Sequence, residues 1–238
     1  MRQFFKKLFT IILSLLLGCT IYISKNDIDK LNHAMNKKYN SLTLNISTVY
    51  RQERGNFPII VERHYQYEIQ AEKMLMKLQS KGEGINQSYT VFGFIDSNNE
   101  MNFYLQHDDD WIQIASLNLD ISTSITRFNC AGCFVYKNRT FVGVTGAIFP
   151  FVESILKTFV ENETTSNILE HQMNLTKYNV KLRLGNINTI SIDMDGSFKK
   201  SSYAKYSYYT MSIDYNYSKL NLTRVKTPDY FVNNNIIK

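Results

Sequence analysis

Long runs in which apolar and polar residues alternate are the feature of this sequence that most restricts its fold. The longest run alternates apolar residues with Ser212, Asp214 and Asn216. Its apolar members are Tyr209, Met211, Ile213, Tyr215 and Tyr217. A period of two is typical of a β-strand with one buried face. Glycine (10) and proline (3) are scarce beside tyrosine (16) and phenylalanine (15), which favours long strands with few breaks. We therefore expect a β-dominated domain.

Shorter runs of the same kind predict further strands that follow one another as antiparallel hairpins. They cover residues 41–51, 59–72, 73–79, 89–95, 101–106, 111–114, 134–136, 139–145, 180–184 and 190–194. Asp195-Gly196 supplies a turn signal after the last of these. Residues 117–129 fit either a loop or a short helix.

Helical spacing of apolar residues occurs in two places. Asn26 or Asp27 can cap a helix over 28–39, in which Ile28, Leu31 and Met35 share a face. A second helix is predicted to start at Pro150 and to run to residue 161. Residues 162–177 fit a linker or a continuation of that helix, and residues 229–238 are expected to form a polar tail that frays.

The first 18 residues have the organisation of a secretory signal. A basic start precedes an apolar run that ends in Leu16-Leu17-Gly18-Cys19. The site is similar to the lipobox of bacterial lipoproteins, in which the cysteine is acylated and becomes the first mature residue. We expect a signal peptide at 1–18, a lipidated Cys19 and a tether at 19–26, so that the domain is anchored outside the bacterial cytoplasmic membrane. An uncleaved anchor and ordinary secretion are the alternatives.

The order of the expected elements resembles a known family. A helix after a lipobox leads into long antiparallel strands, a hairpin closing in Asp110-Trp111, the helix at 150–161 and a last strand before Pro228. This resembles the LolA/LppX-like lipid carriers, and the resemblance covers residues 27–232 as one domain, with a tail at 233–238. It implies an α+β fold in which helices cover the concave face of a curved antiparallel sheet, a half-open barrel. It also implies binding of lipids or other apolar molecules.

Cys130 and Cys133 have no counterpart that this family requires. Outside the membrane, a C-x-x-C pair is most simply a disulfide that closes a small loop. A thiol-disulfide oxidoreductase is a minor alternative, because the motif is followed by a strand-like segment rather than by a helix. Metal binding and free thiols are further alternatives.

Other chemistry has little support in the sequence. The usual hydrolase, nucleotide and zinc-protease motifs are absent, so we expect neither an enzyme nor a cofactor. The aspartates at 108–110 fit a solvated turn better than a calcium loop. The four histidines are scattered, and we expect no metal site. Basic residues do not cluster with aromatic ones, so nucleic acid is not an expected partner.

Two functions remain from the pattern of apolar residues. In the first, a deformable apolar cavity on the concave face binds a lipid, although a closed core would show the same alternation. The residues expected to line it are Met74, Met76, Leu78, Phe92, Phe94, Met211, Ile213 and Tyr215. In the second, the tyrosine-rich strand at 206–217 presents aromatic anchors to another envelope protein.

Overall fold

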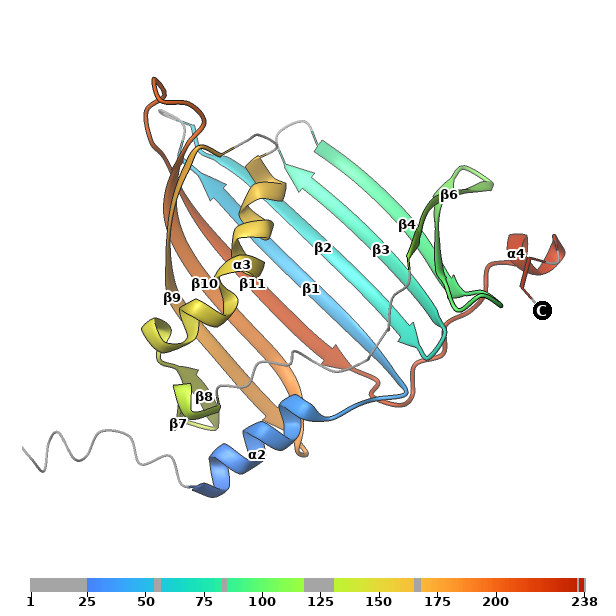
Figure 1. Cartoon of the computed structure of the whole chain (residues 1–238), viewed down its shortest axis with the longest axis horizontal. Helices are drawn as coiled ribbons and strands as arrows, with labels where there is room; N and C mark the ends of the chain where they lie inside the picture. Colours follow the sequence, from blue (N-terminus) through green and yellow to red (C-terminus); the bar gives the residue numbers. More distant parts are fainter. Residues whose placement is uncertain are drawn as a thin grey trace, which may run out of the picture.

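The structure, a computed structural model, describes residues 25–53, 57–82, 85–117, 131–164, 168–234 and 236–237. These residues form one antiparallel sheet of 11 strands, in the order β6-β5-β4-β3-β2-β1-β11-β10-β9-β8-β7, which does not close into a barrel (Figure 1). The strands are β1 (Ser41–Gln52), β2 (Ile59–Gln70), β3 (Lys73–Gly82), β4 (Ile85–Ile95), β5 (Met101–His107), β6 (Asp110–Leu117), β7 (Phe134–Lys137), β8 (Thr140–Gly143), β9 (Glu170–Arg183), β10 (Asn186–Lys199) and β11 (Ser207–Ser218). The β-dominated antiparallel fold is confirmed.

The sheet has two faces, which we name after the helix that packs on each. Helix α3 (Thr145–Thr164) packs on one of them, the α3 face, and contacts β9. Helix α4 (Asp229–Asn233) packs on the opposite face, the α4 face. Directly opposed residues of neighbouring strands share a face, so the pairing register assigns every strand residue to one side.

The main core lies between the α3 face and two helices. Helix α2 (Lys25–Asn36) contributes Leu31 and Met35, which are fully buried. Four residues of α3 form one buried stripe at a spacing of four, as expected for an amphipathic helix. The stripe consists of Ile148, Val152, Leu156 and Val160. The sheet contributes the alternating residues of β10 and β11, including Met211 and Ile213.

A second, separate core lies on the α4 face, at the end of the sheet formed by β4, β5 and β6. Phe92 and Phe94 of β4 pack there with Val225 and the fully buried Phe231 of α4. The chain that leads to α4 is fixed by hydrogen bonds: the Val225 N–H donates to Gln70 Oε1 (2.9 Å), and Lys73 Nζ donates to Thr227 Oγ1 (3.0 Å). The expected frayed tail is therefore wrong for most of residues 229–238.

Helix α3 and strand β9 begin elsewhere than expected. Helix α3 starts at Thr145, five residues before Pro150, because Ile148 extends the buried stripe by one turn. Strand β9 starts at Glu170, within the stretch expected to be a linker or helix.

The turn expected at Asp195-Gly196 is also wrong, since both residues lie inside β10. A Cβ at Gly196 would come within 2.3 Å of the Gln172 carbonyl oxygen and 2.6 Å of the Tyr209 hydroxyl. The glycine thus permits close strand packing rather than a turn.

Candidate functional site

Six half-buried apolar side chains on the α3 face of β2 and β3 form the surface that we call the apolar floor. The register pairs Tyr65 with Leu78, Tyr67 with Met76, and Ile69 with Met74, so that the six side chains form three rows across the two strands. The floor consists of Tyr65, Tyr67, Ile69, Met74, Met76 and Leu78. Alternation in both strands explains its composition, because the residues between these point to the α4 face.

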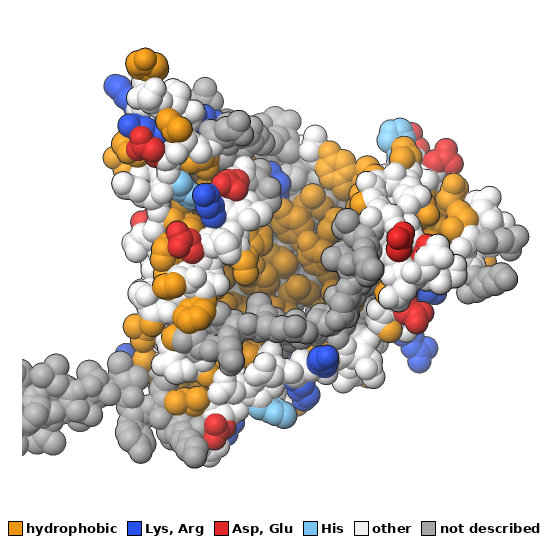
Figure 2. Space-filling model, in the orientation of Figure 1, with side chains coloured by type: hydrophobic (Ala, Val, Ile, Leu, Met, Phe, Trp, Pro, Cys, Tyr) orange, Lys and Arg blue, Asp and Glu red, His pale blue; other side chains and the backbone are white. Residues whose placement is uncertain are grey.

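The floor lies beside α3 rather than under it. Figure 1 shows α3 crossing the sheet over β9, β10 and β11, with β2 and β3 to one side of it. Figure 2 shows hydrophobic side chains at the bottom of a hollow between α3 and the hairpin of β5 and β6. Met74, Met76 and Leu78 are not among the described residues that pack against either core. All three side chains are half-buried, so part of each one is accessible to solvent.

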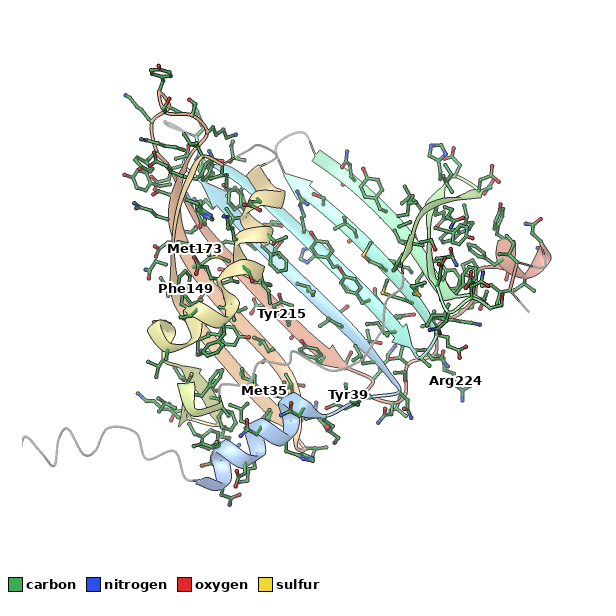
Figure 3. The ribbon with its side chains drawn as sticks, in the orientation of Figure 1. Met35, Tyr39, Phe149, Met173, Tyr215 and Arg224 are labelled. Atoms are coloured by element: carbon green, nitrogen blue, oxygen red, sulfur yellow. The ribbon has the colours of Figure 1, made fainter. Side chains whose placement is uncertain are left out.

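The tyrosines of this region carry neutral hydroxyl groups. Burial raises the pKa of Tyr67, and the neighbouring Tyr65 raises it further. The two rings stack with centroids 6.3 Å apart. Burial also raises the pKa of Tyr215, whose ring lies on β11 beside α3, on the side of β1 and β2 (Figure 3). Apolar side chains and neutral phenols thus form one continuous surface.

The residues expected to line a cavity separate into three groups. Met74, Met76 and Leu78 lie in the floor. Met211 and Ile213 lie on the same face, but at 1% and 0% exposure they belong to the packed core beneath α3. Tyr215 is half-buried and lies at the border between the two, because it pairs with Ile46, which in turn pairs with Tyr65.

Phe92 and Phe94 were expected on the same face as Met74, Met76 and Leu78, and this placement is wrong. Phe92 pairs with Leu75 and Phe94 with Lys73, both of which point to the α4 face. Residues on both faces of β4 are apolar, since Val91 and Ile95 occupy the α3 face. Alternation within β4 therefore could not show which side faces the floor.

A polar row borders the floor, and reasoning from the sequence missed it. The register aligns Thr48 of β1, Arg63 of β2 and Ser80 of β3 on the α3 face, one row from Tyr65. Thr48 is 1% exposed and Ser80 is 6% exposed, whereas Arg63 is half-buried. The sequence does contain a signal for this row. Every second residue of β2 from Ile59 to Ile69 is apolar except Arg63.

A pocket of about 1120 Å³ lies at a different place, on the α4 face of β1, β9, β10 and β11. Its lining is polar and apolar in about equal parts and includes Arg51, Asp195 and Tyr208. Tyr208 is 58% exposed. This pocket does not include any residue that the sequence predicted to bind a ligand.

Of the three cysteines singled out in the sequence, Cys133 is the one that the structure describes. Cys19 and Cys130 lie outside the described residues, whereas Cys133, at the end of the 3₁₀ turn Ala131–Cys133, is disulfide-bonded. Within the described ranges, no group of three His, Cys, Asp or Glu side chains is arranged to hold a metal ion. In that same part of the chain, none of the helices combines the length and apolarity needed to cross a bilayer.

Comparison with known proteins adds no assignment, because no protein family and no curated protein matches this sequence.

Proposed function

We propose that this chain is an extracytoplasmic lipoprotein whose apolar floor binds a lipid or another apolar molecule. In this proposal, acylated Cys19 holds the domain at the outer face of the bacterial cytoplasmic membrane. The α3 face is the inside of a half-open barrel, and the ligand lies against β2 and β3 beside α3. No cofactor or catalytic residue takes part.

The observation that carries the proposal is the partly exposed row of methionines and tyrosines in the floor. Burying such surface stabilises a complex by about 25 cal/mol for each Å² removed from water. Methionine adapts its shape to different ligands, and the paired tyrosines add wide, flat contact surface. The lining is apolar and gives no group that would react with the ligand.

The interaction-module alternative has weaker support in the tyrosine-rich strand. Tyr209 and Tyr217 of β11 are buried, at 2% and 7% exposure, and cannot serve as anchors for a partner. Tyr208 is exposed on the α4 face and lines the pocket there. A partner protein would therefore use a face opposite to the floor.

The test uses the chain with Cys19→Ser, which removes the acylation site and is purified without detergent. Titration with the neutral dye Nile red measures binding by fluorescence. Met76→Glu places a charge in the floor and is expected to weaken binding by about tenfold or more, because the bound dye would desolvate the carboxylate. Mass spectrometry of an organic extract of the same sample identifies any lipid that co-purifies.

The matched control is Gln79→Glu, which adds the same charge to the exposed, opposite side of β3. It is expected to bind dye as the parent chain does. The ligand-binding proposal would be overturned by equal loss of binding in the two variants, or by a parent chain that binds no dye and yields no lipid. Loss of a partner after Tyr208→Ala would instead favour the interaction module.

A further inference from the structure

One end of the sheet carries exposed basic side chains on two neighbouring hairpins, and we call it the basic end. The hairpin of β7 and β8 contributes Lys137 and Arg139, and the hairpin of β9 and β10 contributes Lys181 and Arg183. No ion pair joins any of these four to a carboxylate in the described part of the chain. The sequence explains this, because residues 121–152 and 171–192 contain neither Asp nor Glu.

The basic end lies against the first half of α2, as Figure 1 shows for β7 and β8. Asp27 and Lys30 line a pocket of about 290 Å³ together with residues of both hairpins, including Arg139. The charges of Asp27 and Lys30 offset each other, because the two side chains form an ion pair of 3.3 Å. Asp29 is the other acidic residue of this helix. Basic residues therefore outnumber acidic ones where the described chain enters the fold.

Two exposed hydrophobic side chains accompany the charges. Leu184 is 92% exposed in the turn between β9 and β10, and Tyr136 of β7 is 44% exposed. Leu184 has a φ of 51°, a conformation that hairpin turns usually assign to Asn, Asp or Gly. Leucine and tyrosine beside Lys and Arg form the composition that binds the interfacial region of a bilayer. The basic end thus combines charge for lipid phosphates with an apolar tip.

The proposed lipid anchor joins the domain at this same end. Lys25, the first residue of α2, follows Cys19 by six residues, which span at most about 20 Å. An acylated Cys19 therefore keeps both hairpins within reach of the lipid head groups. The attraction between exposed charges falls off within about 8 Å at physiological ionic strength, so this proximity is what makes the basic side chains effective.

We propose that the basic end docks on an anionic phospholipid bilayer, with its four basic side chains against the lipid phosphates and Leu184 in the interfacial region. The inference rests on the proposed acylation of Cys19 and adds the orientation of the domain to it. The row of Ile69 and Met74 lies at the same end of the sheet, because β2 ends where β9 ends. Docking brings that end of the apolar floor to the side of the domain that faces the bilayer.

The experiment uses the acylated chain in phosphatidylcholine vesicles with or without about 30% phosphatidylglycerol. Hydrogen exchange measured by mass spectrometry reports the protection of each segment. Amides of residues 136–140 and 182–186 are expected to exchange about 5- to 10-fold more slowly on the anionic vesicles. Residues 200–206, at the opposite end of the sheet, are expected to exchange equally on both. Raising NaCl to about 0.5 M is expected to remove the difference and to leave the chain on the vesicles through its acyl chains.

Substitutions then assign the docking to the basic end. Lys181→Gln combined with Arg183→Gln is expected to weaken docking by about 25-fold, or about fivefold for each charge, and so to abolish the protection. The matched control is Lys200→Gln combined with Lys205→Gln, which removes the same charge from exposed positions at the opposite end. The control is expected to keep the protection of the parent chain. Leu184→Ser is expected to reduce the protection in part, because the charges remain.

The outcomes separate docking from the proposals on which it rests. Flotation with both kinds of vesicle, with equal exchange at the basic end, overturns docking and leaves the anchor in place. Equal loss of protection in the two double variants overturns the assignment to the basic end. Failure to float with either kind of vesicle overturns both the anchor and the docking. Dye binding by the Cys19→Ser chain tests the apolar floor independently of these results.

Discussion

The ring of Phe231 in the C-terminal helix α4 lies with its centroid 5.0 Å from that of Phe92 in β4. Tyr104 and Trp111, on β5 and β6, place their rings 5.0 and 5.3 Å from the same phenylalanine. One residue near the end of the chain thereby connects three strands at the β6 side of the sheet. The hairpin that borders the apolar floor depends on this contact from behind.

Phe231→Ala is expected to lower the free energy of unfolding by about 3 to 5 kcal/mol, because it removes a fully buried ring from a packed cluster. Urea denaturation measures this change. Hydrogen exchange is expected to increase in β4, β5 and β6 more than in β9 and β10, which belong to the main core. The control is Val232→Ala, since Val232 is 54% exposed. Equal effects of the two substitutions would contradict a separate second core.

Acid is expected to destabilise the fold through His171. Burial, aided by Lys157, lowers the pKa of His171 from 6.5, and its Nε2 atom lies 2.7 Å from the Tyr209 hydroxyl. The unfolded chain then binds the proton more tightly, so the stabilising contribution is complete above pH 6.5 and is lost as the pH falls through the folded pKa.

Urea denaturation at about pH 7.5 and about pH 5 checks this expectation. His171→Gln is expected to show a smaller loss of stability between the two pH values than the parent chain. The exposed His33, changed to Gln, is the control and is expected to retain the parent's pH dependence. An unchanged pH dependence in His171→Gln would contradict the assignment.

Two glycines that are three residues apart are expected to respond in opposite ways to alanine. A Cβ at Gly143 would come within 2.1 Å of Ile148 Cδ1 and 2.8 Å of the Tyr178 carbonyl oxygen. Gly143→Ala is therefore expected to destabilise the fold by about 1 to 3 kcal/mol. Gly146 has open space at this position and lies in the first turn of α3, so Gly146→Ala is expected to stabilise by up to about 1 kcal/mol. Thermal unfolding of both variants provides the comparison.

Cys19→Ser is expected to move the protein from the membrane fraction to the soluble fraction when the chain is produced in a bacterium. Two acyl chains give stable anchoring, whereas the unacylated domain has no such anchor. Labelling with an alkyne-bearing palmitate followed by gel fluorescence is expected to mark the parent chain and not the variant. Labelling of both forms would contradict acylation at Cys19.

Much of the fold could be predicted from patterns inside single segments. Alternation in β3 placed Met74, Met76 and Leu78 together on one face, because Lys73, Lys77 and Gln79 make the other side mainly polar. Periodicity located α2 and the buried stripe of α3. A strand or helix with one clearly polar face buries its opposite, apolar face, so its orientation follows from its own sequence.

Other features depended on pairing between segments. Phe92 and Phe94 were placed on the wrong face because both sides of β4 are apolar, and only its register with β3 distinguishes them. Gly196 was read as a turn residue because its need for close packing arises from Gln172 and Tyr209, which are distant in sequence.

The sequence by itself determined the strand-rich composition, the alternation of each strand and the apolar stripe of α3, since these follow from the local geometry of the backbone. Only the tertiary structure decided that Arg63 borders the apolar floor with Thr48 and Ser80, and that Phe231 packs behind β4. Register and packing bring together residues from separate strands, and no periodicity within one strand contains that information.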